Sequence, residues 1–166
     1  MNNQATFDKA VEFLIKIGIP VRFESLDKPT FLPGLFIDKG TIILDLEKLK
    51  YPGDLLHEAG HIAIVPAAER LSISEADIAL RKDRESEEMM AIAWSYAVCV
   101  EIDINPSFIF HDEGYNKGGS SIAANFKEER YFGVPMLQWV GMALEKSQAL
   151  ILDKPAYPKM LQWLRD

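Results

Sequence analysis

The sequence predicts an α+β fold: a mainly helical single domain with a small β-hairpin or three-stranded antiparallel sheet next to a helix that carries the pattern H-E-x-x-H. Three observations lead to this fold class. Apolar residues recur at helical spacing through most of the chain, two short apolar runs flank a turn that contains Asp and Gly, and 166 residues suffice for one domain with a sizeable core.

The N-terminal part is expected to form a helix followed by a hairpin. Residues 4–17 place apolar side chains at helical spacing, and Gly18 ends that pattern. Residues 20–23 are typical of a short strand. Residues 35–44 carry β-branched and aromatic runs on both sides of an Asp-Lys-Gly turn, which predicts a β-hairpin, and residues 46–49 favour a short helical turn.

The rest of the chain is expected to be helical. The helix with the H-E-x-x-H pattern begins near residues 52–54 and is ended by Pro66, and a long helix covers about residues 84–102. Between them lies a polar segment, residues 67–83, in which Ser72 and Ser74 are candidate caps. The further expectations are a short helix capped by Asn105, a glycine-rich loop over residues 114–119, a helix capped by Ser120 or Ser121 that runs to about residue 130, and closing helices over residues 135–146 and 156–165.

Charge and cysteine content narrow the classes of partner. The net charge of −7 argues against binding to nucleic acid or to an anionic membrane surface, since both need clustered Lys and Arg. Cys99 is the only cysteine and is expected to be a buried, inert thiol. The N-terminus lacks the features of a signal peptide, and no apolar run reaches transmembrane length, so a reducing, cytoplasmic setting is expected.

His57-Glu58-Ala59-Gly60-His61 is the most specific motif of the chain. Residues four apart share a face of a helix, so His57 and His61 can present two imidazole nitrogens to one Zn²⁺. Glu58 is not needed as a ligand and can take a proton from metal-bound water. The alternative is that both histidines hydrogen-bond within the core or face solvent. Gly60 suggests that another element approaches this helix closely, or it is simply tolerated.

A catalytic zinc ion usually has three protein ligands, so a third is expected downstream. The candidates are Glu85, Glu87, Glu88, Glu101, Asp103 and His111. Glu88 is favoured because residues 92, 96 and 99 on its face of the long helix are Ile, Tyr and Cys, and Glu87 is the second choice. An ordinary solvated acidic first turn, favoured by the helix dipole, is the alternative for this cluster.

Asp45, the H-E-A-G-H motif and the helix centred on Glu88 resemble the gluzincin-type metallopeptidases, and most closely the ImmA/IrrE-like group. The resemblance covers about residues 35–100. It implies His57, His61 and Glu88 as zinc ligands and Glu58 as the general base. The whole chain also resembles a bacterial family of small proteins that share the H-E-A-G-H, A-W-S-Y and G-V-P-M-L-Q-W stretches.

Two further residues are candidates for the site. His111 is either a fourth ligand, a donor to the transition state, or a residue that anchors a loop. Tyr115 is a candidate catalytic residue because a tyrosine hydroxyl can stabilise the oxyanion that forms when water attacks a carbonyl, although packing in the core is the commoner use of a tyrosine.

The leading functional hypothesis is a zinc-dependent, peptidase-like hydrolase that acts on a peptide or small amide. Two alternatives stay open: a metal-binding protein without peptidase activity, in which the metal is structural or regulatory, and an interaction module. The ligand set suits Zn²⁺ but can also hold other divalent transition metals.

Overall fold

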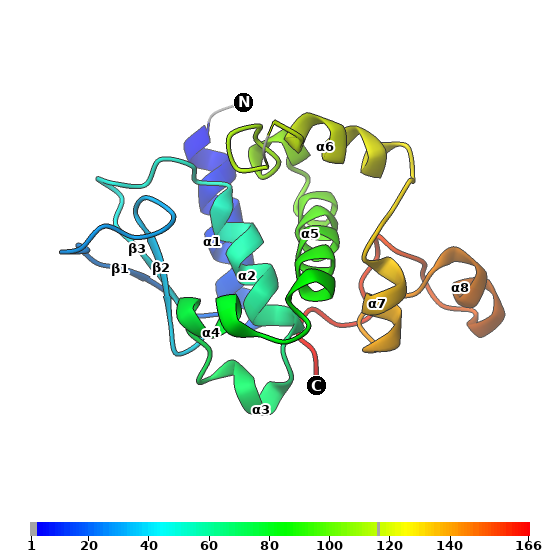
Figure 1. Ribbon diagram of the computed structural model, residues 1–166. Coiled ribbons are helices and arrows are strands. Elements are labelled where there is room, and N and C mark those ends of the chain that lie inside the picture. The colour runs from blue at the N-terminus through cyan, green and yellow to red at the C-terminus, as the bar shows by residue number, and fades with distance from the viewer. Residues whose placement is uncertain (1–2, 116) are drawn as a thin grey trace.

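A computed structural model describes residues 3–115 and 117–166 and has the expected class, a mainly helical α+β domain. Figure 1 shows α2 at the centre of the molecule, with a small sheet on one side, α5 on the other and α1 behind. The elements are α1 (Asn3–Ile17), β1 (Val21–Phe23), β2 (Leu35–Asp38), β3 (Thr41–Leu44), α2 (Asp54–Ile64), α3 (Ala67–Arg70), α4 (Glu75–Leu80), α5 (Arg84–Glu101), the 3₁₀ helix η1 (Pro106–Phe108), α6 (Gly119–Lys127), α7 (Val134–Trp139) and α8 (Lys146–Leu152).

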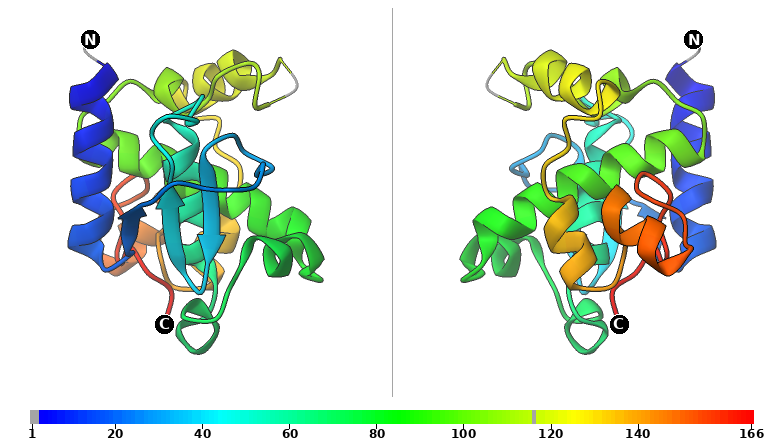
Figure 2. Two further views of the ribbon diagram at one scale, coloured as in Figure 1. Left: turned by 90° about the vertical axis from the view of Figure 1, so that its left-hand side faces the viewer. Right: turned by 90° about the vertical axis from the view of Figure 1, so that its right-hand side faces the viewer.

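The sheet contains the predicted hairpin but is mixed rather than antiparallel. Strands β2 and β3 pair antiparallel around Lys39 and Gly40, which both have the positive φ that a tight hairpin turn requires. Strand β1 pairs parallel with β3, so the strand order is β1-β3-β2. The expectation of a three-stranded antiparallel sheet is therefore wrong. The reason is the connection over residues 24–34, which carries the chain past β3 so that β1 and β2 lie on opposite edges (Figure 2).

Helices α2 and α5 form the centre of the core and lie where the sequence predicts them. Most residues of α2 are buried, as a helix that is apolar on nearly every side requires. Gly60 on α2 faces Ala91 on α5, and the hydroxyl of Ser95 donates hydrogen bonds to the carbonyls of Leu56 and Ala91. Gly60 is thus the point of close approach that its position in the motif suggests.

The segment between α2 and α5 is more ordered than its polar composition indicates. Two short helices, α3 and α4, occupy it. Ser74 caps α4 in a reciprocal capping box with Asp77, as expected of one of the two candidate serines. Ser72 is not a cap, because its hydroxyl donates to the carbonyl of Glu69. Residues 46–48 form the expected short helical turn, in which Leu49 donates its backbone N–H to the carbonyl of Asp45 four residues earlier.

The C-terminal part departs most from the sequence expectations. The sequence predicts one helix over residues 135–146. Instead, α7 ends at Trp139, Gly141 follows with a φ of 77°, and a separate helix, α8, begins at Lys146. Residues 156–165 are not helical. Pro158 lacks the N–H that a helix needs, and Arg165 donates its backbone N–H to the carbonyl of Ala63 on α2. The apolar side chains of residues 156–165, here named the C-terminal strap, therefore pack without forming a helix.

The segment from η1 to α6 agrees with the sequence expectations at one cap and differs at the other. Asn105 caps η1 by accepting the backbone N–H of Ser107, as expected. Helix α6 begins at Gly119 with Gly118 as its N-cap, so neither Ser120 nor Ser121 is the cap. The predicted loop over residues 114–119 contains residue 116, which lies outside the described residues. Among the helices of the described residues, none is both long enough and apolar enough to cross a membrane.

Candidate metal site

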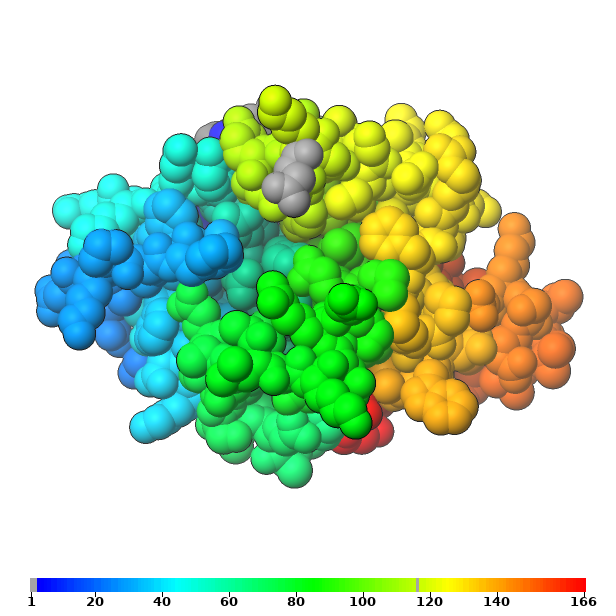
Figure 3. Space-filling view, in the orientation of Figure 1, coloured from blue at the N-terminus to red at the C-terminus, as the bar shows by residue number. Residues whose placement is uncertain are grey.

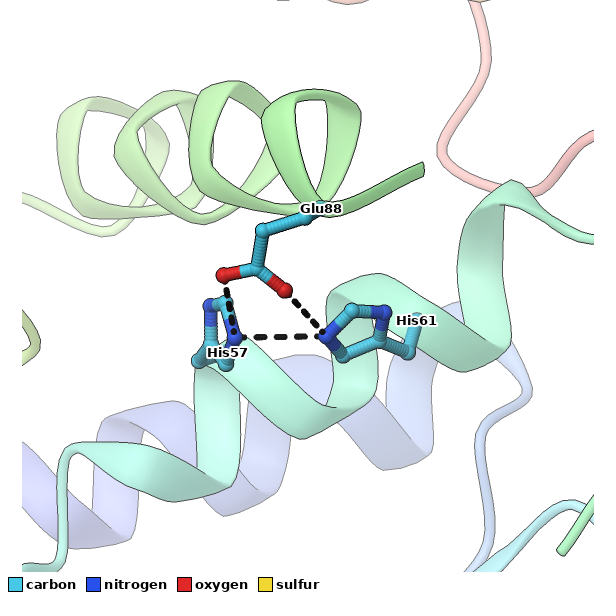
Figure 4. A group of neighbouring side chains, drawn as sticks. All are labelled: His57, His61 and Glu88. Atoms are coloured by element: carbon cyan, nitrogen blue, oxygen red, sulfur yellow. Dashed lines mark hydrogen bonds and ion pairs between the residues drawn. The ribbon is translucent and has the colours of Figure 1, made fainter. Parts of the chain in front are cut away.

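His57 and His61 lie one turn apart on α2 and direct their imidazole rings to the same point (Figure 4). Their Nε2 atoms are 3.2 Å apart and the two rings are nearly perpendicular. Both side chains are largely buried, with exposed fractions of 14% for His57 and 8% for His61. The helical spacing of the motif therefore brings two nitrogen donors together.

Glu88 completes a group of three candidate ligands from the first turns of α5. Its Oε1 lies 3.4 Å from Nε2 of His57, and its Oε2 lies 3.2 Å from Nε2 of His61. The side chain of Glu88 is 43% exposed and borders an open hollow at the start of α5, so this member of the group is accessible from solvent. In the space-filling view, the green surface of α4 and the start of α5 fills the middle of this face, below the yellow-green segment near residue 115 (Figure 3).

Glu87, the second choice for a third ligand, is directed elsewhere. It is buried, and both of its carboxylate oxygens accept from Nε of Arg81, at 2.7 and 2.8 Å. Arg81 also binds Glu69. Of the other candidates, Glu101 pairs with Lys159, and Glu85 and Asp103 are exposed. Adjacent residues on one helix point about 100° apart, so α5 can present only one of Glu87 and Glu88 to α2.

The charges of the three residues depend on one another. Burial opposes ionisation of Glu88, but hydrogen bonds and charge interactions with His57 and His61 outweigh it and hold the pKa of this carboxyl well below its ordinary value. Burial likewise lowers the pKa of His57, and the interactions with Glu88, Glu58 and Asp54 reverse that effect, so the net shift of its pKa is upward. His57 and Glu88 therefore each favour the charged form of the other.

The spacing of these atoms fits a tetrahedral metal ion. Metal–ligand bonds of about 2.0–2.1 Å at tetrahedral angles place neighbouring ligand atoms about 3.3–3.4 Å apart. The two Nε2 atoms are 3.2 Å apart, and each lies 3.2–3.4 Å from a different oxygen of Glu88, while one ligand atom from each of the three residues lies within 4.8 Å of the others. These three residues form the group of His, Cys, Asp and Glu side chains that could hold a metal ion within the described residues.

Glu58 follows His57 on α2 and is partly exposed. Among the described residues, its side chain has no hydrogen-bond or ion-pair partner that would occupy the carboxylate. Glu75 of α4 lies close enough to interact with it: burial raises the pKa of Glu75, the charge of Glu58 raises it further, and a backbone hydrogen bond from Phe31 partly offsets both. No sequence pattern connects Glu75 with Glu58.

Tyr115 lies beside the two histidines. Its ring packs edge-on against His57 with ring centroids 5.7 Å apart, and its hydroxyl is buried without a hydrogen-bond partner among the described residues. Burial, and then the charges of Asp54, Glu88 and Glu58, raise the pKa of this hydroxyl, so it stays protonated. A buried hydroxyl without a partner is costly unless another group comes to bind it.

His111 lies outside the group of three. Its Nε2 is 2.7 Å from a carboxylate oxygen of Asp54, and its Nδ1 accepts the backbone N–H of Gly114 at 3.0 Å. Its ring also stacks on Tyr51. Of the roles weighed from the sequence, the anchoring of a loop fits these contacts, and ligation of the metal does not. Asp54 was missed because an acidic first residue of a helix is common for dipole reasons alone.

Asp45, the other residue in the resemblance to gluzincins, is also distant from the group. Its carboxylate accepts the backbone N–H groups of Leu26 and Glu47 and pairs with Lys48. These contacts fix the turn that follows β3. Comparisons with protein-family models, curated proteins and solved structures find no match to this chain.

Proposed function

We propose that this protein is a zinc-dependent hydrolase of the metallopeptidase type that cleaves a peptide or a small amide. The observation that carries the proposal is the convergence of His57, His61 and Glu88 at separations of 3.2–3.4 Å. Two imidazoles and a carboxylate from neighbouring helices are a common ligand set of catalytic zinc. The same set can hold other divalent transition metals.

A bound zinc ion would polarise the substrate carbonyl and lower the pKa of a water molecule toward neutrality. Glu58 is the general base: its carboxylate is unoccupied, it follows a ligand in sequence, and it can pass the proton it takes to the leaving amine. Tyr115 supplies a protonated donor for the oxyanion, since its hydroxyl is buried beside His57 and has no partner among the described residues.

A catalytic rather than a purely structural metal is favoured by what surrounds the three ligands. A structural zinc ion has a closed shell of four protein ligands. Of the other candidate ligands weighed from the sequence, Glu87 is bound by Arg81 and His111 by Asp54. The 43% exposure of the Glu88 side chain supports access to the site from solvent. A water molecule or a substrate can therefore reach the metal.

The first measurement is metal content and affinity. Protein purified without chelator is analysed for bound metals, and the metal-free protein is titrated with Zn²⁺. We expect one zinc ion per chain in the wild type and in Glu58→Gln. Zinc affinity should fall by at least about 100-fold in Glu88→Gln and should stay unchanged when the exposed neighbour is replaced in Glu85→Gln. A wild-type protein that binds no zinc contradicts the proposal.

The second measurement is hydrolysis of a mixed library of internally quenched peptides by the zinc-loaded protein. Glu58→Gln should reduce kcat/KM by at least about 100-fold while zinc stays bound. Glu85→Gln is the matched control, since it removes a carboxylate from the same turn of α5 as Glu88. Activity that survives in Glu58→Gln at the wild-type level assigns the proton transfer to another group.

A further inference from the structure

The segment that carries His111 and Tyr115 is closely packed at glycine positions, against the residue before α2 at Gly53 and within itself at Gly114 and Gly119. A Cβ on Gly53, the residue before α2, would collide with the carbonyl of Phe108. A Cβ on Gly119 would lie 2.5 Å from the carbonyl oxygen of Phe110, and one on Gly114 would lie 2.7 Å from the ring of His111. Contacts this close are possible only because these residues lack side chains.

A chain of polar contacts fixes the ring of His111 in one tautomer. Its Nδ1 accepts the N–H of Gly114, so the proton is on Nε2 and is donated to the carboxylate of Asp54. Asp54 is 7% exposed and is the first residue of α2, three positions before His57. The contact therefore ties the loop directly to the helix that carries the two histidine ligands.

Tyr115 directly follows Gly114 in the sequence, so the contact between His111 and Asp54 also fixes the position of Tyr115. Its ring touches three neighbours edge-on, with centroids 5.5 Å from Phe110, 5.7 Å from His57 and 6.2 Å from His111. Two of these neighbours belong to the same loop. The third, His57, joins the loop to α2 only through a contact between rings. The polar bond between the loop and α2 is the one between His111 and Asp54.

We infer that Asp54 and His111 are positioning residues that hold the hydroxyl of Tyr115 at the metal site. They touch neither the ligand atoms nor the substrate, and they act through the loop. The part of this inference that concerns catalysis rests on the proposed hydrolase function. The part that concerns the place of Tyr115 does not, because it needs neither zinc nor a substrate to be tested.

The first test measures how accessible Tyr115 is. The metal-free protein is treated with tetranitromethane, and the nitration of each tyrosine is followed by peptide mass spectrometry. His111→Phe keeps an aromatic ring against Tyr51 but removes both hydrogen bonds, so Tyr115 should nitrate about tenfold faster or more. His111→Gln can still donate to Asp54 and should restore most of the protection.

Two other tyrosines serve as internal references. Tyr157 is buried and donates its hydroxyl hydrogen bond to the carbonyl of Ala93, so it should stay protected, while the partly exposed Tyr131 should react in every variant. Faster nitration of Tyr115 with Tyr157 protected supports the inference. Unchanged nitration of Tyr115 overturns it. If Tyr157 also reacts, His111→Phe has unfolded, and Asp54→Ala, which removes the acceptor of the His111 hydrogen bond, decides by the same criterion.

The second test uses the hydrolysis assay. His111→Phe and Tyr115→Phe should lower kcat by the same factor with little change in KM, and the double variant should be no slower than Tyr115→Phe alone. Additive losses would show that His111 acts independently of Tyr115 and would overturn its positioning role. If no hydrolysis is found in the wild type, the proposed function fails, while nitration still decides where the loop holds Tyr115.

Discussion

The close approach of Gly60 on α2 to Ala91 on α5 makes Gly60→Ala a sharp probe of how the site is built. A Cβ at position 60 would lie 3.0 Å from the carbonyl oxygen of Ala91, 3.1 Å from its Cα and 3.2 Å from its Cβ. Carbon contacts are optimal at about 3.5–4.0 Å. The two helices must therefore move apart by a few tenths of an ångström.

Two opposing effects set the change in stability. Alanine stabilises a helix interior by roughly 1 kcal/mol relative to glycine. Overpacking a dense core costs about 1–3 kcal/mol. The free energy of unfolding should therefore fall by about 0–2 kcal/mol. Because Glu88 lies one turn before Ala91 on α5, the displacement also moves it from the histidines, and zinc affinity should fall about tenfold.

Urea unfolding of the metal-free protein gives the stability term, and zinc titration gives the affinity. Ala91→Gly is the matched partner substitution: combined with Gly60→Ala, it removes the Cβ contact but leaves the two backbone contacts, so only part of the loss should be recovered. A Gly60→Ala protein that gains the full helix-propensity term of about 1 kcal/mol and binds zinc as tightly as the wild type would refute this reasoning.

Three other outcomes are expected. Zinc at 100 times the wild-type Kd should stabilise the wild type by about 2.7 kcal/mol, raising Tm by about 5–11 °C in a thermal scan, and should raise the Tm of Glu88→Gln by no more than about 1–2 °C. Glu87→Gln should cost about 1–3 kcal/mol in urea unfolding because Arg81 loses a buried partner, yet it should retain one zinc ion per chain. In the metal-free protein, the raised pKa of His57 contributes stability that is fully present below the ordinary pKa of 6.5 and is lost as the pH rises through the shifted pKa. Urea unfolding at a series of pH values measures this decline. The same decline in Glu88→Gln would contradict its origin in the interaction of His57 with Glu88.

The sequence predicts the two candidate ligands that lie on one helix because local geometry alone decides how they are placed relative to each other. Residues four apart on a helix are neighbours whatever surrounds it, so His57 and His61 were bound to meet once α2 formed. The hairpin is local in the same sense, since Asp38, Lys39 and Gly40 favour the turn themselves. The parallel pairing of β1 with β3 is not local, because it depends on the path of residues 24–34.

The C-terminal strap shows how a correct period can give the wrong structure. The apolar residues between 156 and 165 recur at helical spacing, and Tyr157, Met160, Trp163 and Leu164 lie in the core or pack against it. Their backbone, however, bonds to distant carbonyls: Leu161 donates to Met142, and Arg165 to Ala63. Trp94 donates its indole N–H to the carbonyl of Trp163. Partners so far away in sequence leave no periodic trace.

The choice between Glu87 and Glu88 turns on a residue that the sequence does not connect to either. Both carboxylates lie in the first turns of α5, and both share a face with apolar residues. Arg81, in the turn after α4, binds Glu87 together with Glu69 and so fixes the rotation of α5 about its axis. With Glu87 held there, a step of about 100° directs Glu88 toward α2. The ion pair of Arg81 thus occupies the competing glutamate, although it contributes no atom to the site.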